Sequence, residues 1–322
     1  MSKTEMKYRP LGKCGTKVSM FSLGGWTTFG ESVNDSRVIG EILRVAFDAG
    51  VIFFDMSDIY NKGETERAMG AVLREFPRHG LVLSSKVFFP MSDDVNDRGL
   101  SRKHIMESVE KSLKRIGTDY LDLYFCHRFD PDTPLEETAR AMDDLVHQGK
   151  ILYWGTSDWT GAQLREVHAI CEKRNLYKPQ VEQPRYNLLS RKAFETDVAP
   201  AVLDLGMGAV SFSPLAYGVL TGKYDQGLPP GSRLDRIEWT RKRYYTETTL
   251  QRVKKMKDLA GQAGCTRAQL ALAWTASRPA ISSVITGATR LEQLHENLGA
   301  LAVSMTEDLK SALDNLFPLE ND

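Results

Sequence analysis

Short apolar runs recur along this chain of 322 residues, and they limit its fold more than any other feature. The runs lie near positions 20, 52, 82, 122, 152, 180, 209 and 283, and segments with helical periodicity separate them. Their Val, Ile, Leu and Phe content is typical of strands buried on both faces of a parallel sheet. Eight β–α units predict an α/β fold, a closed (β/α)8 TIM barrel, with residues 1–322 as one domain.

Two segments outside this repeat are also predicted. Residues 7–19 indicate a β-hairpin, with its turn from Gly12 to Gly15, that plugs the amino end of the barrel. Before the last strand, a Gly- and Pro-rich loop over 213–240 precedes a charged helix over 241–263, and loops of this length often cover a site. Apolar side chains in the loop suit packing on a ligand or the barrel rim rather than a disordered insert. They are Tyr217, Leu220, Tyr224, Leu234 and Trp239.

Two helices carry clear start and stop signals. Thr133 and Glu136 form a capping-box pattern around Pro134, which takes the first helical position, and Gly149 ends this helix. The preceding helix is predicted to begin at Ser101 and to end at Gly117.

The composition excludes several classes of protein. The 42 Lys and Arg residues balance 42 Asp and Glu residues, so no excess of charge points to nucleic acid or to an anionic membrane. No apolar stretch is long enough to cross a bilayer, and the first residues lack the apolar core of a signal peptide. Scattered cysteines suit free thiols in a reducing cytoplasm better than disulfides or a zinc site. These cysteines are Cys14, Cys126, Cys171 and Cys265.

Four chemically distinct side chains follow three of the apolar runs. Asp55 and Tyr60 follow the second run, Lys86 ends the third, and His127 ends the fourth. In barrels of parallel strands, catalytic groups lie at the carboxyl ends of the strands. We therefore expect an acid, a phenol, an amine and an imidazole to meet in one mouth of the barrel.

Together these groups suit reduction of a carbonyl group, which needs a hydride for carbon and a proton for oxygen. Tyr60 would donate the proton, and the Lys86 ammonium would lower the pKa of this phenol from roughly 10. Asp55 would keep Lys86 charged and oriented, while His127 would hydrogen-bond to the substrate oxygen. Taken alone, each residue also has an interpretation without catalysis: Tyr60 could be a packing residue, Asp55 a helix cap and Lys86 a solvated side chain.

Rival motifs are incomplete. The sequence from Gly155 to Trp159 begins like a nucleophile elbow but lacks the closing glycine. His295 and Glu296 begin a zincin motif, but Gly299 stands where the second histidine belongs. No GxGxxG follows the first strand, which argues against a Rossmann fold but not against a nicotinamide cofactor.

Longer motifs carry a resemblance to a known family. They are KYRPLGKCGTKVS (7–19), GLSRKHI (99–105), DPDTPLEET (130–138), YWGTS (153–157), FSPLAYGVLTGKY (212–224) and GATRLEQLHENLGAL (287–301). From Tyr8 to Leu301 the chain resembles the aldo-keto reductases, and it is most similar to the branch that holds the voltage-gated potassium channel β subunits and their microbial and plant reductase relatives. That branch usually has Asp-Thr-Ala after the second strand, whereas this chain has Asp55, Met56 and Ser57.

The resemblance implies NADPH or NADP+ as cofactor. The nicotinamide would contact Trp26, Ser157, Gln183 and Phe212, and the pyrophosphate would contact Ser213, Leu215, Gly218 and Lys223. The adenosine 2′-phosphate would meet Arg233, Thr289 and Gln293, the adenine would meet Glu296 and Asn297, and Gly287 belongs to the same site. A lysine and an arginine suit a dianionic group, and the helix start at Thr289 would offer free backbone donors.

Two positions bear on this cofactor assignment. Asp158 stands where many relatives have asparagine, and its carboxylate either accepts from the carboxamide or points away. Gln293 stands where many reductases have arginine, and Arg290 is close enough in sequence to compensate. We expect a preference for NADPH over NADH.

Two functions of different class fit the resemblance. One is an NADPH-dependent reductase of aldehydes or ketones; the other is a nucleotide-binding regulatory subunit, with weak reductase activity, that docks on a channel or another partner. Position 127 favours the enzyme, because the channel β subunits have asparagine there and His127 completes the tetrad of efficient reductases. The branch also leads us to expect a homo-oligomer, a tetramer or larger, in the cytoplasm.

The substrate is a small carbonyl compound whose identity these patterns leave open. Arg128 suits either an anionic substrate or plain solvation. Several aromatic side chains suit either an apolar substrate pocket or packing of the barrel rim. They are Trp26, Phe29, Phe88, Phe89, Phe129 and Trp159.

Overall fold

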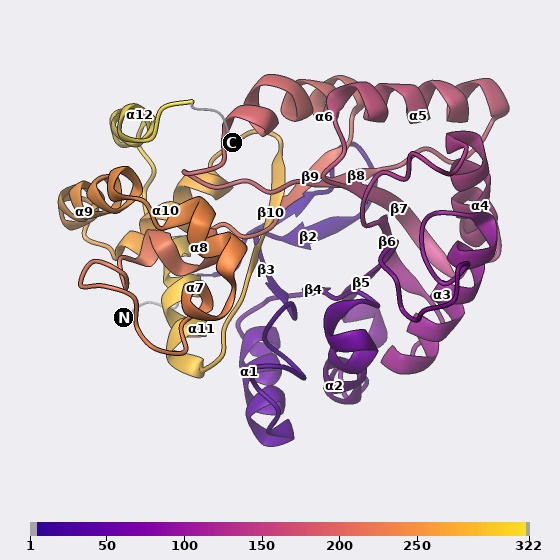
Figure 1. Cartoon of the computed structure of the whole chain (residues 1–322), viewed down its shortest axis with the longest axis horizontal. Helices are drawn as coiled ribbons and strands as arrows, with labels where there is room; N and C mark the ends of the chain where they lie inside the picture. The colour runs from indigo at the N-terminus through magenta and orange to yellow at the C-terminus, as the bar shows by residue number, and fades with distance from the viewer. Residues whose placement is uncertain (1–4, 320–322) are drawn as a thin grey trace.

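A closed barrel of parallel strands forms the centre of the molecule. The computed structural model describes residues 5–319, and within them eight strands form the barrel in the order β10-β3-β4-β5-β6-β7-β8-β9 (Figure 1). Pairing of Val284 with Phe21 joins the last strand to the first and closes the ring. The strands are β3 (Phe21–Gly24), β4 (Phe53–Asp55), β5 (Val82–Val87), β6 (Leu121–Cys126), β7 (Ile151–Ser157), β8 (Val181–Gln183), β9 (Gly208–Ser211) and β10 (Ile281–Thr286). All eight predicted runs are strands, and the (β/α)8 TIM barrel is confirmed.

Helices surround the strands and cover their outer faces (Figure 1). The longer ones are α1 (Ser36–Asp48), α2 (Glu64–Leu73), α3 (Arg102–Ile116), α4 (Leu135–His147), α5 (Gly161–Arg174), α6 (Ala199–Leu205), α9 (Glu247–Gln262), α10 (Arg267–Ala276), α11 (Leu291–Leu298) and α12 (Glu307–Leu316). Shorter helices are η1 (Tyr60–Gly63), η2 (Arg78–Gly80), η3 (Phe194–Val198), η4 (Ala216–Thr221), α7 (Arg233–Arg236), α8 (Glu238–Tyr244) and η5 (Gly299–Ala302).

The predicted start and stop of α3 are confirmed, whereas the capping box of α4 is wrong. In α3, the Ser101 side chain accepts a hydrogen bond from the amide of His104, and Gly117 ends the helix with φ of 77°. In α4, the Thr133 hydroxyl group donates to Asp130 at 2.8 Å, so it caps no helix amide. Pro134 precedes the helix, and Glu136 pairs with Arg140 instead.

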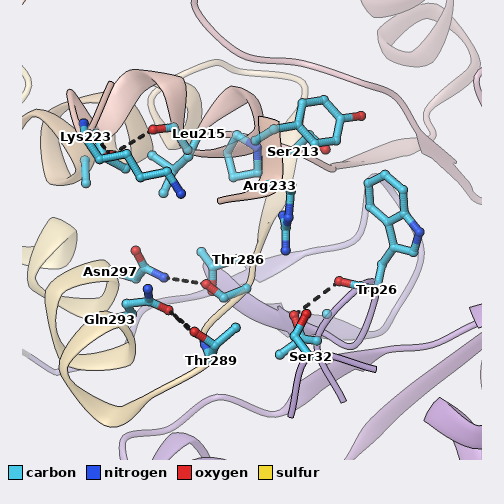
Figure 2. Close-up of a pocket in the computed structure, with 18 of the residues that line it drawn as sticks. Trp26, Ser32, Ser213, Leu215, Lys223, Arg233, Thr286, Thr289, Gln293 and Asn297 are labelled. Carbon is cyan, nitrogen blue, oxygen red and sulfur yellow. Dashed lines mark hydrogen bonds between the residues drawn. The ribbon is translucent and has the colours of Figure 1, made fainter. Parts of the chain in front are cut away.

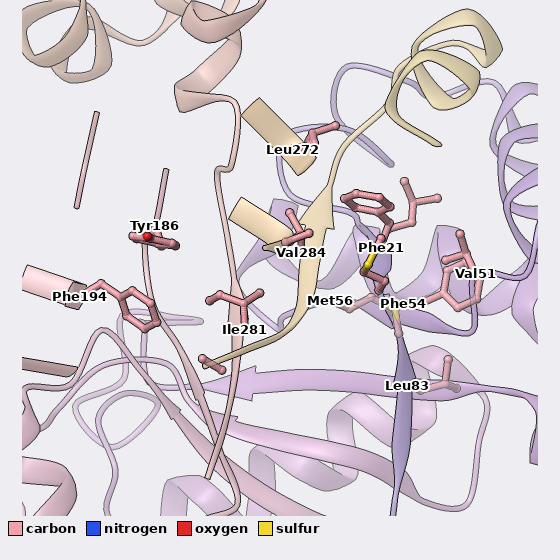
Figure 3. Packing of buried hydrophobic residues seen from close by; sticks show 14 of the residues in the cluster. Phe21, Val51, Phe54, Met56, Leu83, Tyr186, Phe194, Leu272, Ile281 and Val284 are labelled. Atoms are coloured by element: carbon pink, nitrogen blue, oxygen red, sulfur yellow. The ribbon is translucent and has the colours of Figure 1, made fainter. Parts of the chain in front are cut away.

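Two apolar layers hold the barrel. Phe53, Phe125 and Val210 fill its interior, and Leu11 and Val18 of the hairpin join this inner cluster. The hairpin consists of β1 (Tyr8–Pro10) and β2 (Lys17–Ser19), paired antiparallel as predicted. A larger cluster fills the space between strands and helices, and Figure 3 shows Phe21, Phe54, Val284 and Leu272 within it. Burial of such side chains supplies most of the favourable free energy of folding.

The long segment before β10 is ordered, but its helix is divided. The predicted helix over 241–263 is two helices, because α8 ends at Tyr244 and the Thr246 hydroxyl group caps the start of α9. Four of the five apolar residues singled out in this segment are buried, so the disordered-insert alternative is wrong. The fifth, Trp239, is 49% exposed and packs edge to face on Tyr217.

Candidate active site

The four side chains at the strand ends lie together. Asp55 is the last residue of β4, Lys86 lies near the end of β5, His127 follows β6, and Tyr60 begins η1. The Lys86 ammonium donates to Asp55 Oδ2 at 2.7 Å and to the Tyr60 hydroxyl oxygen at 3.0 Å. The Tyr60 and His127 ring centroids are 5.8 Å apart. This is the cluster that the sequence pattern predicts at the carboxyl end of the barrel.

Hydrogen bonds satisfy the buried ion pair from both sides. Lys86 is fully buried and also donates to the Met56 carbonyl oxygen at 2.7 Å. Asp55 Oδ1 accepts from Ser84 Oγ at 2.8 Å and from Gln183 Nε2 at 3.0 Å. A buried ion pair whose remaining donors and acceptors are satisfied holds one geometry, so the Lys86 ammonium is aimed at the phenol.

Burial changes the acid–base properties of this cluster. Desolvation raises the pKa of Tyr60 well above its ordinary value, and the Asp55 charge adds to this effect. The net pKa is raised because burial and the Asp55 charge are the largest influences on this phenol, and the lowering that we expect from the Lys86 ammonium stays a prediction. The phenol keeps its proton near neutral pH and is a proton donor by default.

His127 is neutral in this environment. Burial, followed by the charges of Lys86 and Arg128, holds the pKa of the imidazole well below its ordinary value. Its Nδ1 atom lies 3.1 Å from Ser57 Oγ, and its ring packs edge to face on Phe89 with centroids 4.9 Å apart. A neutral imidazole can still donate one hydrogen bond, from whichever nitrogen carries the proton.

A small cavity of about 250 Å³ opens beside Tyr60 and His127. Its lining is mostly apolar and consists of Trp26, Ile59, Tyr60, Phe89, His127, Arg128, Ser157, Gln183 and Phe212. The predicted aromatic pocket is thus only partly correct, because two of its six residues, Trp26 and Phe89, line the cavity. Of the others, Phe129 and Trp159 pack on each other, with ring centroids 5.0 Å apart.

Arg128 is held at the edge of this cavity by Asp158. Its guanidinium lies 3.2 Å from the Asp158 carboxylate, which also accepts from the Arg185 amide at 3.1 Å. Asp158 itself has φ of 54°, an unusual conformation for a residue other than glycine. The Asp158 carboxylate therefore pairs with the Arg128 guanidinium and accepts a hydrogen bond from the Arg185 backbone amide.

A second cavity, of about 820 Å³, continues from the first and shares Trp26, Tyr60 and Phe212 with it. Every residue that the resemblance assigns to the cofactor lines one of the two cavities. Ser157 and Gln183 line the small one. The large one is lined by Trp26, Phe212, Ser213, Leu215, Gly218, Lys223, Arg233, Gly287, Thr289, Gln293, Glu296 and Asn297. In Figure 2, Lys223 and Leu215 face Gln293 and Asn297 across the opening.

The charges that line the large cavity fit an anionic ligand. Within residues 5–319, neither Lys223 nor Arg233 takes part in an ion pair. Desolvation and the charges of Arg233 and Arg290 lower the pKa of Lys223, and desolvation lowers the pKa of Arg233. Gly218 has φ of +89°, and a Cβ there would lie 2.7 Å from Lys223 Nζ. The positive φ favours glycine at this position, whereas the contact with the flexible end of Lys223 can relax.

One expected feature of this cavity is wrong. The backbone amide of Thr289 is not free, because it donates to Gln293 Oε1 at 2.8 Å, and the Thr289 hydroxyl group does the same at 3.0 Å. Helix α11 begins only at Leu291, so the Gln293 side chain reaches back over the preceding turn. Asn297, in the same helix, donates to the Gly287 carbonyl oxygen at 3.1 Å.

Comparison with known proteins identifies the family of this chain. Residues 21–317 match the aldo/keto reductase family. The chain belongs to the aldo/keto reductase family. A probable voltage-gated potassium channel subunit beta of Arabidopsis thaliana is 44% identical over 303 residues, which cover 92% of both chains. A probable subunit beta from Oryza sativa has the same identity and coverage, and a putative one from Schizosaccharomyces pombe is 41% identical over 97% of this chain and 94% of its own.

Membership in this family makes the protein an oxidoreductase, and aldo/keto reductases generally use a nicotinamide cofactor. The cavities and their lining fit that general description. Along residues 5–319, no helix combines the length and the apolar character needed to cross a membrane.

Sequence reasoning missed several residues of this aldo/keto reductase site. Arg236 of the long segment donates to Ser32 at 3.2 Å and so connects the loop to the segment after β3. Ser57 and Asp58 lie behind His127, and Glu182, beside Gln183 in β8, accepts a hydrogen bond from Thr156. Asp58 carried a signal as a carboxylate close after a strand end, and Ser57 as a departure from the family pattern. The other contacts join residues far apart in the chain.

Proposed function

We propose that this aldo/keto reductase uses NADPH to reduce aldehydes or ketones to alcohols, with Tyr60 as general acid. One observation carries the proposal: the Lys86 ammonium donates to the Tyr60 hydroxyl group beside a small, largely apolar cavity. That cavity is continuous with a larger one lined by Lys223 and Arg233. A carbonyl compound and a phosphorylated dinucleotide are the ligands that suit these two spaces.

Each of the four residues has a distinct role in this proposal. NADPH supplies the hydride when bound. Tyr60 gives its proton to the carbonyl oxygen, and Lys86, 3.0 Å from the phenol oxygen, stabilises the phenolate that remains. Asp55 keeps Lys86 charged against the desolvation that lowers its pKa. Neutral His127 donates a hydrogen bond to the same carbonyl oxygen as negative charge develops on it.

We further propose how the residues of the two cavities hold NADPH. The nicotinamide would lie against Phe212 and Trp26, with its carboxamide at Ser157 and Gln183. The pyrophosphate would lie under Ser213, Leu215, Gly218 and Lys223. The adenosine 2′-phosphate would meet Arg233, Thr289 and Gln293, and the adenine would meet Glu296 and Asn297 near Gly287. The absence of an ion-pair partner for Lys223 and Arg233 within residues 5–319 supports the anionic part of this assignment.

A regulatory role is the second candidate, because the relatives at 41–44% identity are named as potassium channel β subunits. In that case the protein would bind NADPH and a channel, with weak reductase activity. His127 argues for the enzyme, because it completes the set of four residues that the resemblance to efficient reductases implies. A homo-oligomer, a tetramer or larger, located in the cytoplasm is part of both proposals, and sedimentation of the purified protein would test its size.

The substitution His127→Asn tests the enzyme against the regulatory subunit. We expect unchanged NADPH binding and a single-turnover rate of hydride transfer to aldehydes lower by about 10²–10³-fold, the usual effect of losing one oxyanion donor. Loss of NADPH absorbance in a stopped-flow instrument measures this rate separately from cofactor release. Hydride transfer at the parental rate would show that His127 only packs, and it would favour the regulatory role.

A further inference from the structure

The hydroxyl group of Ser57 lies between a histidine and an aspartate behind the proposed active site. Ser57 Oγ is 3.1 Å from His127 Nδ1 and 3.2 Å from Asp58 Oδ1, and all three side chains are buried. A serine hydroxyl group has one proton to donate. It can therefore donate either to His127 or to Asp58, but not to both.

The direction of this hydrogen bond decides which nitrogen of His127 faces a ligand as a donor. If Ser57 donates to Nδ1, the imidazole proton is on Nε2, on the opposite side of a ring that lines the small cavity. If Ser57 donates to Asp58, Nδ1 must carry the proton in order to donate to Ser57. Nε2 then presents a lone pair, which repels a carbonyl oxygen.

The surroundings of Asp58 favour a protonated carboxyl group. Its Oδ2 atom is buried and has no hydrogen-bond partner among the described residues, whereas the Ile59 amide, which donates to Oδ1 at 2.6 Å, favours the ionised form and opposes protonation. Burial, then the charge of Glu66, raises the pKa of Asp58 to about 8. A protonated Asp58 can donate to Ser57 Oγ, which leaves the serine proton for His127 Nδ1.

Charged groups on the neighbouring elements face Asp58 from several sides. Glu66 of α2 opposes its ionisation but is itself paired with Arg115 of α3 at 2.5 Å, and Arg115 favours ionisation. Lys86 of β5 and the phenols of Tyr60 and Tyr124 also interact with Asp58. The net result of burial and of these charges is the raised pKa of Asp58.

We propose that Ser57 is a positioning residue that holds His127 with its proton on Nε2, and that Asp58 controls this tautomer through the Ser57 hydroxyl group. The proposal rests on the proposed function only for its consequence, which is that ionised Asp58 leaves the carbonyl oxygen without its histidine donor.

Nitrogen NMR of the imidazole rings tests the tautomer without any substrate. The full chain is labelled with 15N-histidine, and comparison with His127→Gln identifies the His127 signals among those of six histidines. We expect Nε2–H at pH 6.5 and conversion to Nδ1–H as the pH rises through about 8. In Ser57→Ala and in Asp58→Asn this conversion should be absent. A wild-type tautomer that stays the same from pH 6.5 to 9.5 would overturn the proposal.

Kinetics test the consequence, with a matched control from another part of the barrel. At pH 7, Ser57→Ala should lower kcat/KM by about tenfold, as one hydrogen bond that selects the tautomer is lost. The wild-type decline above pH 8 should be absent from Asp58→Asn. Ser108 also contacts a buried histidine, at 3.4 Å from His104 Nε2, so Ser108→Ala should change neither rate nor pH profile.

The two measurements separate the proposals. A tautomer switch in a protein that reduces no carbonyl compound would refute the proposed function and leave the coupling of Asp58 to His127 intact. Reduction with the full wild-type pH profile in Ser57→Ala would refute the positioning role alone.

Discussion

The buried ion pair of Asp55 and Lys86 should couple far more strongly than an exposed pair of the same length. Lys86 Nζ lies 2.7 Å from Asp55 Oδ2, and the two side chains are 0% and 4% exposed. Arg44 and Glu75 lie at the same 2.7 Å on the surface, where they are 48% and 51% exposed. Since the distance is equal, the main differences between the two pairs are burial and the further hydrogen bonds that Lys86 makes to Met56 and Tyr60.

The expected magnitudes follow from what remains when one partner is removed. Lys86→Met leaves the Asp55 carboxylate buried, and breaking such a pair commonly costs about 3–5 kcal/mol. The donors Ser84 and Gln183 still bind this carboxylate, so we expect a loss of about 2–4 kcal/mol in the free energy of unfolding. The exposed pair should contribute about 0–1 kcal/mol.

Double-mutant cycles measure both couplings. One cycle uses Asp55→Asn and Lys86→Met, and the control uses Glu75→Gln and Arg44→Met, each followed by urea unfolding at pH 7 with two spectroscopic probes. Coincident transitions are required before free energies are compared. If the two coupling energies agree within about 1 kcal/mol, the argument that burial strengthens this pair is wrong.

Three further predictions concern the cofactor, the acid and the wall of the small cavity. NADP+ should raise Tm more than NAD+ at equal concentration, because Lys223 and Arg233 suit an additional phosphate; equal shifts would remove that assignment. Tyr60→Phe should lower turnover by about 10²–10⁴-fold while NADPH affinity stays the same, and retained turnover would place the acid elsewhere. Burial, then Asp158, raises the pKa of Glu182 from 4.5 to about 8, so the stability that its neutral form contributes is lost as pH rises through 8. In urea unfolding, the free energy of unfolding of Glu182→Gln relative to wild type should therefore increase by about 2–4 kcal/mol from pH 5 to pH 9. An equal difference between variant and wild type at both pH values would mean that Glu182 is ionised throughout.

Much of this protein follows from local sequence pattern. The apolar runs predict the positions of the strands, because a strand buried on both faces must be apolar along its whole length. The meeting of Asp55, Tyr60, Lys86 and His127 follows from the barrel, since its parallel strands bring their carboxyl ends to one mouth. Ser101 and Gly117 determined the ends of α3, because caps act within a few residues.

The errors arose where a distant or competing group changed a local preference. The Thr133 hydroxyl group donates to Asp130 and does not cap the helix start. The Thr289 amide donates to the Gln293 side chain and is not available to a ligand. The Tyr60 phenol has a raised pKa because desolvation depends on everything packed around it. The hydrogen-bond partner of His127 Nδ1 could not be predicted from local pattern, because this partner, Ser57, is 70 residues away in the sequence.

Sequence by itself thus determined the barrel, the four side chains at its mouth and the family to which they belong. Tertiary structure alone decided which side chains line the cavities, which groups carry protons and which donors remain available. The physical reason is that periodicity and capping act over a few residues, whereas burial and hydrogen bonding depend on atoms that only the folded chain brings together.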